Sequence, residues 1–345
     1  AGVVAGRADQ ILQVISDVPE DKLGDIARYA KETPIQVECA HTPRLLDIVL
    51  TGWAGDHTAL VHIADSHSNV VRVERDGQVL REKALDAAGQ AGQERKMSVE
   101  DILAFAREVD LGLVSDLLDR QIEYNSAIAA EGLSGDWGAN IGSVLLGDWP
   151  ADIKTEAKAW AAAGSDARMS GCEMPVVILS GSGNQGITAS VPVIRYAKHL
   201  GADREALYRA LLVSDLVTIH QKSGIGRLSA YCGAISAGVG AGAGIAFLEE
   251  GTYEAVAHTI VNAVAILSGT ICDGAKPSCA AKIAASVDAG LLGYRMWRNS
   301  QEFKSGDGIV TKGVDNTIAN VGVLAKEGMQ ETDKVILEIM THRCT

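Results

Sequence analysis

The sequence predicts an α+β protein in which a small, mainly antiparallel β unit is joined to a large all-helical domain. Two patterns support this. Between residues 34 and 83, runs rich in β-branched residues often alternate with polar ones and are separated by polar turns. From Ser98 onward, apolar residues recur at helical spacing. The 345 residues include 37 glycines and only 4% aromatic side chains, which favours helices packed closely through small residues.

Three regions are predicted along the chain. Residues 1–33 form leading helices, expected to be the remainder of a longer N-terminal part, with a break at Asp17-Val18-Pro19. Residues 34–97 form the small β domain and a polar linker, with strands expected in "IQVECA", "LLDIVLTGW", "HTALVHIAD" and "NVVRVERDG". Residues 98–345 form the helical catalytic domain.

Capping signals and periodicity place the helices of the third region. Ser98 is the predicted N-cap of the first helix, with Asp101 as the acidic residue of a capping box. Later helices are expected at 151–163, about 187–200, 203–220, 228–248, 252–267 and 277–292. Residues 230–248 are uncharged, but they are rich in Gly and Ala and are followed by Glu249-Glu250. We therefore expect a buried helix of a soluble protein here rather than a membrane span.

Charge and cysteine usage restrict the class of protein. The formal net charge is −13, and no cluster of basic residues is interleaved with aromatic ones, which argues against a nucleic-acid surface. The six cysteines do not have the spacing of a small disulfide framework, and the first residues do not form a signal peptide. The sequence favours a cytoplasmic protein with a small-molecule ligand; a homo-oligomer is compatible with it.

A glycine-rich turn is the first candidate site. The stretch "LSGSGNQGITASVPV" follows an extended run and leads into a helix expected to begin near Gly186. Backbone N–H groups in such a turn and the helix N-terminus favour an anion, either a carboxylate or a phosphate. The alternative is a purely structural turn. The candidate binding residues are Ser180, Gly181, Ser182, Gly183, Asn184 and Gln185.

Basic residues form the second candidate site, in "TIHQKSGIGRLSAYCG". His220 and Lys222 are candidates for a catalytic base, and Lys222 or Arg227 for holding a carboxylate. The alternative for each residue alone is a surface charge or a helix cap.

Cysteines form the third candidate site. Cys232 opens the glycine-rich helix, and Cys272 and Cys279 flank the turn in "ICDGAKPSC". No CxxC motif occurs, so a zinc ribbon is disfavoured, whereas the ligands of an iron–sulfur cluster can be dispersed. A helix N-terminus after Cys272 would stabilise its thiolate. We predict that Cys232 and Cys272 face one pocket lined by the turn at 179–186, with Cys279 packed beneath it; a small core residue is the alternative for Cys232.

The motifs "SGSGNQGI", "GRLSAYCGA" and "ICDGAKPSC", together with "SDARMSG" and "EYNSAIAAEGL", resemble the L-cysteine desulfidase family, relatives of the α chain of iron–sulfur L-serine dehydratases. The resemblance implies a [4Fe-4S] cluster held by three cysteines, with Cys232 and Cys272 at ligand positions. It also implies removal of sulfide from L-cysteine to give pyruvate and ammonia. The third ligand of that family lies in an N-terminal Gly-Cys-Thr-Glu-Pro motif, which this sequence lacks.

Three other functions stay open on the sequence. The chain is compatible with an amino-acid or anion-binding protein of the same fold without a cluster, and with a deaminase that resembles serine dehydratase. Lys276, beside a glycine turn, also allows a lyase that depends on pyridoxal phosphate. Each of these functions has a small-molecule amino acid or anion as partner, without nucleic acid or membrane.

Overall fold

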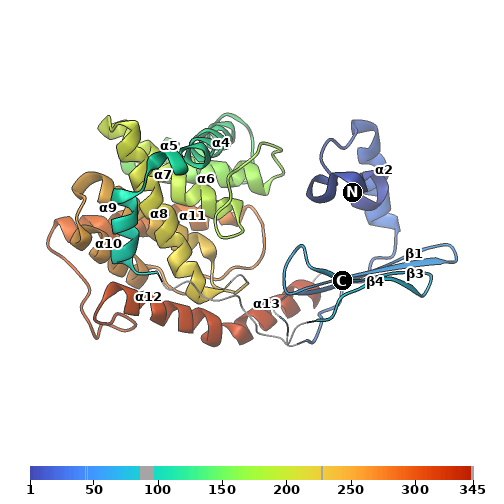
Figure 1. Cartoon of the computed structure of the whole chain (residues 1–345). Coiled ribbons are helices and arrows are strands. Elements are labelled where there is room, and N and C mark those ends of the chain that lie inside the picture. The colour runs from blue at the N-terminus through green and yellow to red at the C-terminus, as the bar shows by residue number, and fades with distance from the viewer. Residues whose placement is uncertain (43, 45, 86–96, 227, 343–345) are drawn as a thin grey trace.

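A four-stranded antiparallel sheet and a larger helical part follow one another along the chain (Figure 1). The structure is a computed structural model, and it describes residues 1–42, 44, 46–85, 97–226 and 228–342. The predicted α+β class, with a small β unit and a large helical part, is confirmed.

Short helices precede the sheet. They are α1 (Gly2–Ala5), the 3-10 helix η1 (Ala8–Gln13) and α2 (Glu20–Glu32). The chain breaks between η1 and α2 because Asp17 takes a left-handed conformation, with φ at 54°, and because Pro19 is the N-cap of α2. The predicted break in the leading helices is therefore confirmed.

Hairpins build the sheet in the order β1 (Asp47–Ala54), β2 (His57–Ala64), β3 (Val70–Arg75) and β4 (Gln78–Glu82). The prediction of a strand in "IQVECA" was wrong, because residues 35–40 have no regular structure. The fourth strand of the sheet is instead β4, which was not predicted. Asp76 and Gly77 have φ of 51° and 78°, the backbone of a two-residue hairpin turn, and this turn folds β4 back onto β3.

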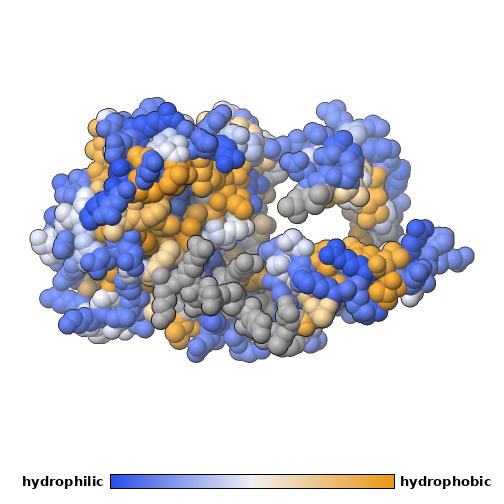
Figure 2. All heavy atoms as spheres, viewed as in Figure 1, coloured by the Kyte–Doolittle hydropathy of each residue, from blue (hydrophilic) through white to orange (hydrophobic). Residues whose placement is uncertain are grey.

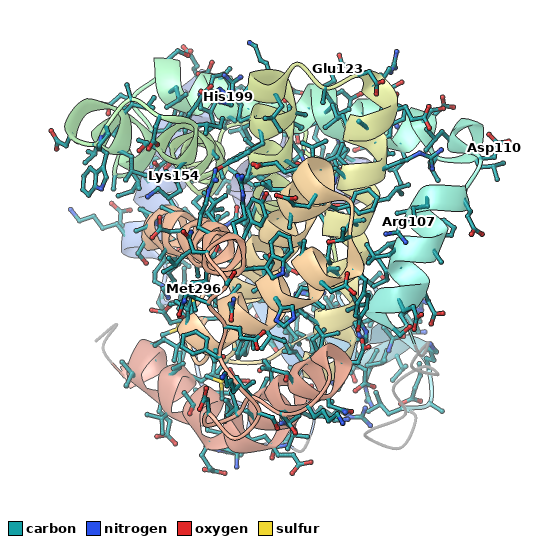
Figure 3. The ribbon with its side chains drawn as sticks, turned by 90° about the vertical axis from the view of Figure 1, so that its left-hand side faces the viewer. Arg107, Asp110, Glu123, Lys154, His199 and Met296 are labelled. Carbon is teal, nitrogen blue, oxygen red and sulfur yellow. The ribbon has the colours of Figure 1, made fainter. Side chains whose placement is uncertain are left out.

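Helices form the rest of the described chain. Ser98 caps α3 (Val99–Glu108) by accepting a hydrogen bond from the Asp101 N–H, as predicted. Exposed side chains such as Arg107, Glu123 and His199 lie on the outside of this part (Figure 3). The elements that follow α3 are η2 (Leu111–Leu113), α4 (Ser115–Ser134), α5 (Ile141–Asp148), α6 (Ile153–Met169), α7 (Gly183–Leu200), α8 (Arg204–Ile225), α9 (Gly233–Glu250), α10 (Tyr253–Ile266), α11 (Ser278–Arg298), α12 (Val314–Val323), a π-helical turn η3 (Leu324–Gly328) and α13 (Gln330–His342).

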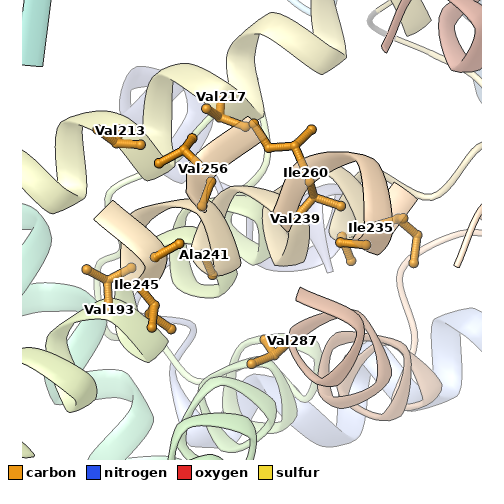
Figure 4. Packing of buried hydrophobic residues seen from close by; sticks show 14 of the residues in the cluster. Val193, Val213, Val217, Ile235, Val239, Ala241, Ile245, Val256, Ile260 and Val287 are labelled. Atoms are coloured by element: carbon orange, nitrogen blue, oxygen red, sulfur yellow. The ribbon is translucent and has the colours of Figure 1, made fainter. Parts of the chain in front are cut away.

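The glycine-rich helix α9 is the centre of the core, with α7, α8, α10 and α11 around it (Figure 4). Its residues from Ala234 to Ala246 are buried, as predicted. A Cβ atom on Gly242 would come within 2.7 Å of Gly290 in α11, so the two backbones touch only because both residues are glycine. Among the described residues, no helix has the length and apolarity needed to cross a membrane.

Apolar side chains also remain at the surface of the sheet. Val49, Leu50 and Trp53 on β1 are largely exposed, and Figure 2 shows hydrophobic surface over this region. The main core therefore lies in the helical part, and the N-terminal ends of α7 and α9 lie at its edge.

Candidate functional site

Two chain segments that are distant in sequence pair with each other and bring Cys232 and Cys272 together. Tyr231 and Ile271 form an antiparallel bridge. The N–H of Cys232 donates to the carbonyl of Thr270 at 2.9 Å, and that of Cys272 donates to the carbonyl of Ala230 at 2.6 Å. The side chains of Cys232 and Cys272 then lie close enough to interact with each other. The backbone pairing thus brings the two cysteines together.

This sulfur pair is electrically asymmetric. The interaction with Cys232 lowers the pKa of Cys272, and the N–H of Gly274 and the charges of Lys282 and Lys276 lower it further against the effect of burial. The same interaction, together with burial, raises the pKa of Cys232. The surroundings therefore favour a thiolate at Cys272 and a thiol at Cys232. The helix expected at 277–292 is confirmed as α11, which begins at Ser278 with Pro277 as its N-cap. Cys272 precedes this N-terminus and belongs to the paired segment.

Lys222 lies against this pair from the last turns of α8. Its side chain is only 8% exposed, and no acidic side chain in the described chain forms an ion pair with it. Its charge interacts with Cys272 and Cys232, while burial lowers the pKa of its amine. Burial beside two sulfur atoms, without a carboxylate partner among the described residues, therefore disfavours the charged form of this amine.

His220 is in a different environment. Residues two apart on a helix lie about 200° apart around its axis, so His220 and Lys222 occupy opposite sides of α8. The Nε2 of His220 lies 2.8 Å from Oδ1 of Asp315, which also accepts the N–H of Val99 at 3.1 Å. His220 thus ties α8 to the starts of α12 and α3. The third predicted residue, Arg227, lies outside the described residues.

The glycine-rich turn reaches the cysteine segment through Gln185. Helix α7 begins at Gly183, one turn earlier than predicted, because Ser180 and Gly181 have φ of 48° and 83° and turn the chain. Gln185 is 7% exposed, and a Cβ atom on Gly233 would overlap its amide nitrogen. Gln185 therefore packs directly on the residue after Cys232.

The six predicted residues of this turn are not equally placed. Ser180 and Gly181 are exposed, whereas Gly183, Asn184 and Gln185 are buried. Ser182 is the N-cap of α7, and its side chain accepts from the N–H of Gln185 at 3.5 Å. The buried half of the turn is thus the part that meets the cysteines.

Arg168 also belongs to this region, although the sequence analysis did not select it. It lies near the end of α6, and its Nη1 donates to Oδ1 of Asn184 at 3.3 Å. A Cβ atom on Gly183 would overlap the Nε of Arg168. The sequence does contain a signal for it: no acidic residue stands three or four positions from Arg168, so this basic residue has no partner along its own helix.

Cys279 and two further lysines complete the surroundings. The Sγ of Cys279 lies 3.7 Å from the carbonyl oxygen of Gly274, and Arg168 and Lys282 are its basic neighbours. Lys282 donates to Asp273 Oδ1 at 2.6 Å and to the carbonyl of Ile271 at 2.8 Å. Lys276 also forms an ion pair with Asp273. Asp273 thus holds two lysines beside the sulfur pair.

A surface cavity of about 530 Å³ lies elsewhere and is lined by Glu250, His258, Arg298 and Glu302, among others. Its charged groups already pair, with His258 Nδ1 2.6 Å from Glu302 and Arg298 Nη1 3.2 Å from Glu249. Lys222, in contrast, lies beside the cysteines without an acidic partner in the described chain.

The buried Cys232 beside the exposed Cys272, the start of α7 and nearby basic side chains together form a region whose chemistry suits an anionic small molecule. Residues 13–338 match the family described as serine dehydratase alpha chain, and the chain belongs to this family. It is 55% identical to a UPF0597 protein of Desulfitobacterium hafniense over 100% of this chain and 81% of that protein. It is 44% identical to a UPF0597 protein of Finegoldia magna over 99% and 82%, and 37% identical to the UPF0597 protein YhaM of Escherichia coli O157:H7 over 99% and 81%.

Proposed function

We propose that the protein is a lyase that eliminates the β substituent of a small α-amino acid, with L-cysteine as the favoured substrate and residues 98–345 as the catalytic domain. The observation that carries the proposal is the contact of Cys232 with Cys272 beside the unpaired Lys222. Membership of the serine dehydratase alpha chain family supports the reaction type. The use of free cysteines supports a cytoplasmic setting.

The two sulfur atoms fit two ligands of an iron–sulfur cluster. Both are sulfur donors, their side chains interact, and Lys282 lies close enough to stabilise negative charge on them. Within the described ranges, no group of three His, Cys, Asp or Glu side chains could hold a metal ion. The described residues therefore provide two of the three ligands that the resemblance implies. When bound, such a cluster supplies a Lewis acid for the leaving group.

The side chains of this protein supply the remaining chemistry. The carboxylate of the substrate binds at the buried start of α7, where the N–H groups of Gly183 and Asn184 have no acceptor within the helix. The amine of Lys222 takes the proton from Cα, and burial favours its neutral form. The electron pair of the Cα–H bond forms the Cα=Cβ bond as the Cβ–S bond breaks and sulfide leaves. Water then converts the enamine to pyruvate and ammonia.

A second function is supported by the incomplete set of ligands. If no cluster forms, the same cations and helix N-terminus suit an amino-acid or anion-binding protein of this fold. A serine dehydratase-like deaminase would use the same groups with water as the leaving group. Lys276, the lysine of the pyridoxal alternative, already forms an ion pair with Asp273.

The visible spectrum of protein purified without oxygen separates these functions. An iron–sulfur lyase shows broad visible absorption that matches its measured iron and acid-labile sulfide. A binding protein shows no chromophore, and a pyridoxal enzyme shows a band that borohydride removes. Colourless protein that contains no iron after anaerobic reconstitution would refute the cluster-dependent lyase.

A further inference from the structure

Arg168 carries a charge that no carboxylate in the described chain neutralises. Two comparable half-buried arginines of the helical part each pair with a glutamate: Arg195 with Glu156, and Arg209 with Glu205 at 2.8 Å. Among the described residues, Arg168 has only the side-chain oxygen of Asn184 as hydrogen-bond partner, at 3.3 Å. A guanidinium removed from water without a counter-ion costs free energy, so this position suits an anionic ligand that completes the pair.

The start of α7 is shaped to receive this guanidinium. Gly183 has no side chain, and a Cβ atom there would overlap the Nε of Arg168. The guanidinium therefore lies on the first turn of α7, where N–H groups also point toward an anion. The amide of Gln185 adds an independent sign of a ligand: the residue is 7% exposed, and its Oε1 has no partner among the described atoms.

Gln185 also fixes the direction in which a ligand would lie. Its amide packs on Gly233, next to Cys232, while Arg168 lies at the other end of the same helical turn beside Asn184. The two ends differ chemically: one offers a guanidinium, and the other offers sulfur atoms and Lys222.

We infer that Arg168 binds the α-carboxylate of the substrate and thereby determines that the site accepts α-amino acids rather than simple amines. This rests on the proposed function, which places the β substituent at the cysteine pair. A guanidinium forms two parallel hydrogen bonds with a carboxylate, so it fixes the orientation of the ligand as well as its charge.

Equilibrium binding of two small thiols to the purified protein tests this without requiring turnover. The probe 3-mercaptopropionate carries a carboxylate and no amine, and cysteamine carries an amine and no carboxylate. We expect Arg168→Ala to weaken binding of 3-mercaptopropionate by about 10- to 100-fold, the loss of a charged hydrogen-bonded pair, and to leave cysteamine unchanged. Arg168→Lys should have an intermediate effect.

Two further variants separate this role from a general loss of structure. Gly183→Ala keeps Arg168 but displaces its guanidinium, so it should also weaken 3-mercaptopropionate. Arg107→Ala is the control, because exposed Arg107 likewise has no acidic partner within the described ranges and donates to the carbonyl of Gly251 at 2.7 Å (Figure 3). Circular dichroism and thermal melting show that each variant is folded.

Equal binding of 3-mercaptopropionate by wild type and a folded Arg168→Ala variant would overturn the inference, and so would an equal loss of both probes. Other results would contradict the proposed reaction without contradicting this inference. If carboxylate binding depends on Arg168 but L-cysteine is not consumed, the inference stands and the reaction is wrong. If sulfide is released at the same KM without Arg168, only the inference is wrong.

Discussion

The side chain of Cys232 meets that of Cys272 across two paired segments that belong to different parts of the sequence. If this pair holds iron, then Cys232→Ala and Cys272→Ala should each lose bound iron and sulfide release together. Iron analysis and the visible spectrum after anaerobic reconstitution measure this. Cys172→Ala is the control, since Cys172 lies in a loop and packs at the edge of the core. Full iron content in folded Cys272→Ala protein would contradict the assignment.

Lys222 and His220 offer two competing assignments of the base. Because Lys222 faces the sulfur pair and His220 pairs with Asp315, we expect Lys222→Gln to lower kcat by about 10²- to 10⁴-fold with little change in KM. His220→Gln should instead lower the melting temperature and leave kcat nearly unchanged. The opposite pattern, with a folded but inactive His220→Gln, would assign the base to His220.

Close contact of α9 with α11 predicts a large effect from one methyl group. Gly242→Ala places a Cβ atom 2.7 Å from Gly290 in a packed core, which should lower the free energy of unfolding by about 1–3 kcal/mol. Gly147→Ala is the matched control, because Gly147 lies on the exposed side of α5 with nothing within 4 Å of a Cβ atom. The control should be neutral or slightly stabilising. Urea unfolding measures both, and equal stability of the two variants would contradict the packing.

Asp215 on α8 gives a pH dependence of stability. Burial raises its pKa to about 7, although the hydrogen bond from Gln121 at 3.0 Å opposes the rise. Between about pH 4 and pH 7 the unfolded state has released this proton and the folded state has kept it, so Asp215 lowers the free energy of unfolding as the pH rises. Above about pH 7 both states are ionised and the cost is constant.

The variant Asp215→Asn should therefore stabilise the protein more at pH 8 than at pH 4, on the order of 1–2 kcal/mol. This gain in stability is smaller than the one expected for a fully buried carboxylate, because Asp215 is only partly buried. Glu123→Gln is the control, since it removes an exposed carboxylate from α4, the helix that carries Gln121 (Figure 3). Thermal melting across this pH range measures both variants. An equal gain at pH 4 and pH 8 would show that ionisation of Asp215 is not the cause.

Local signals in the sequence predicted most of the long helices, whereas α5, α12 and α13 were not predicted. The Ser98 cap and the uncharged part of helix α9 followed from patterns within one element. Strand β4 was missed because its five residues are all exposed and show little alternation of apolar and polar side chains. The Asp76-Gly77 turn, which is typical of a hairpin, indicates this strand more clearly than its own residues do.

The site was predictable only in part, because its contacts join distant segments. The turn at Gly183 and the thiols were selected by their local motifs. The side of α8 that faces the thiols was not predictable, so Lys222 and His220 were equally plausible as the base. Arg168 was missed because its contact with Asn184 depends on how α6 packs against α7.

The most direct test of the central claim is the yield of sulfide and pyruvate from L-cysteine by anaerobically reconstituted protein, with L-serine run in parallel. We expect equimolar sulfide and pyruvate from L-cysteine, a lower rate of pyruvate formation from L-serine, and loss of both products in Lys222→Gln. Reconstituted protein that binds L-cysteine and releases neither sulfide nor pyruvate would contradict it.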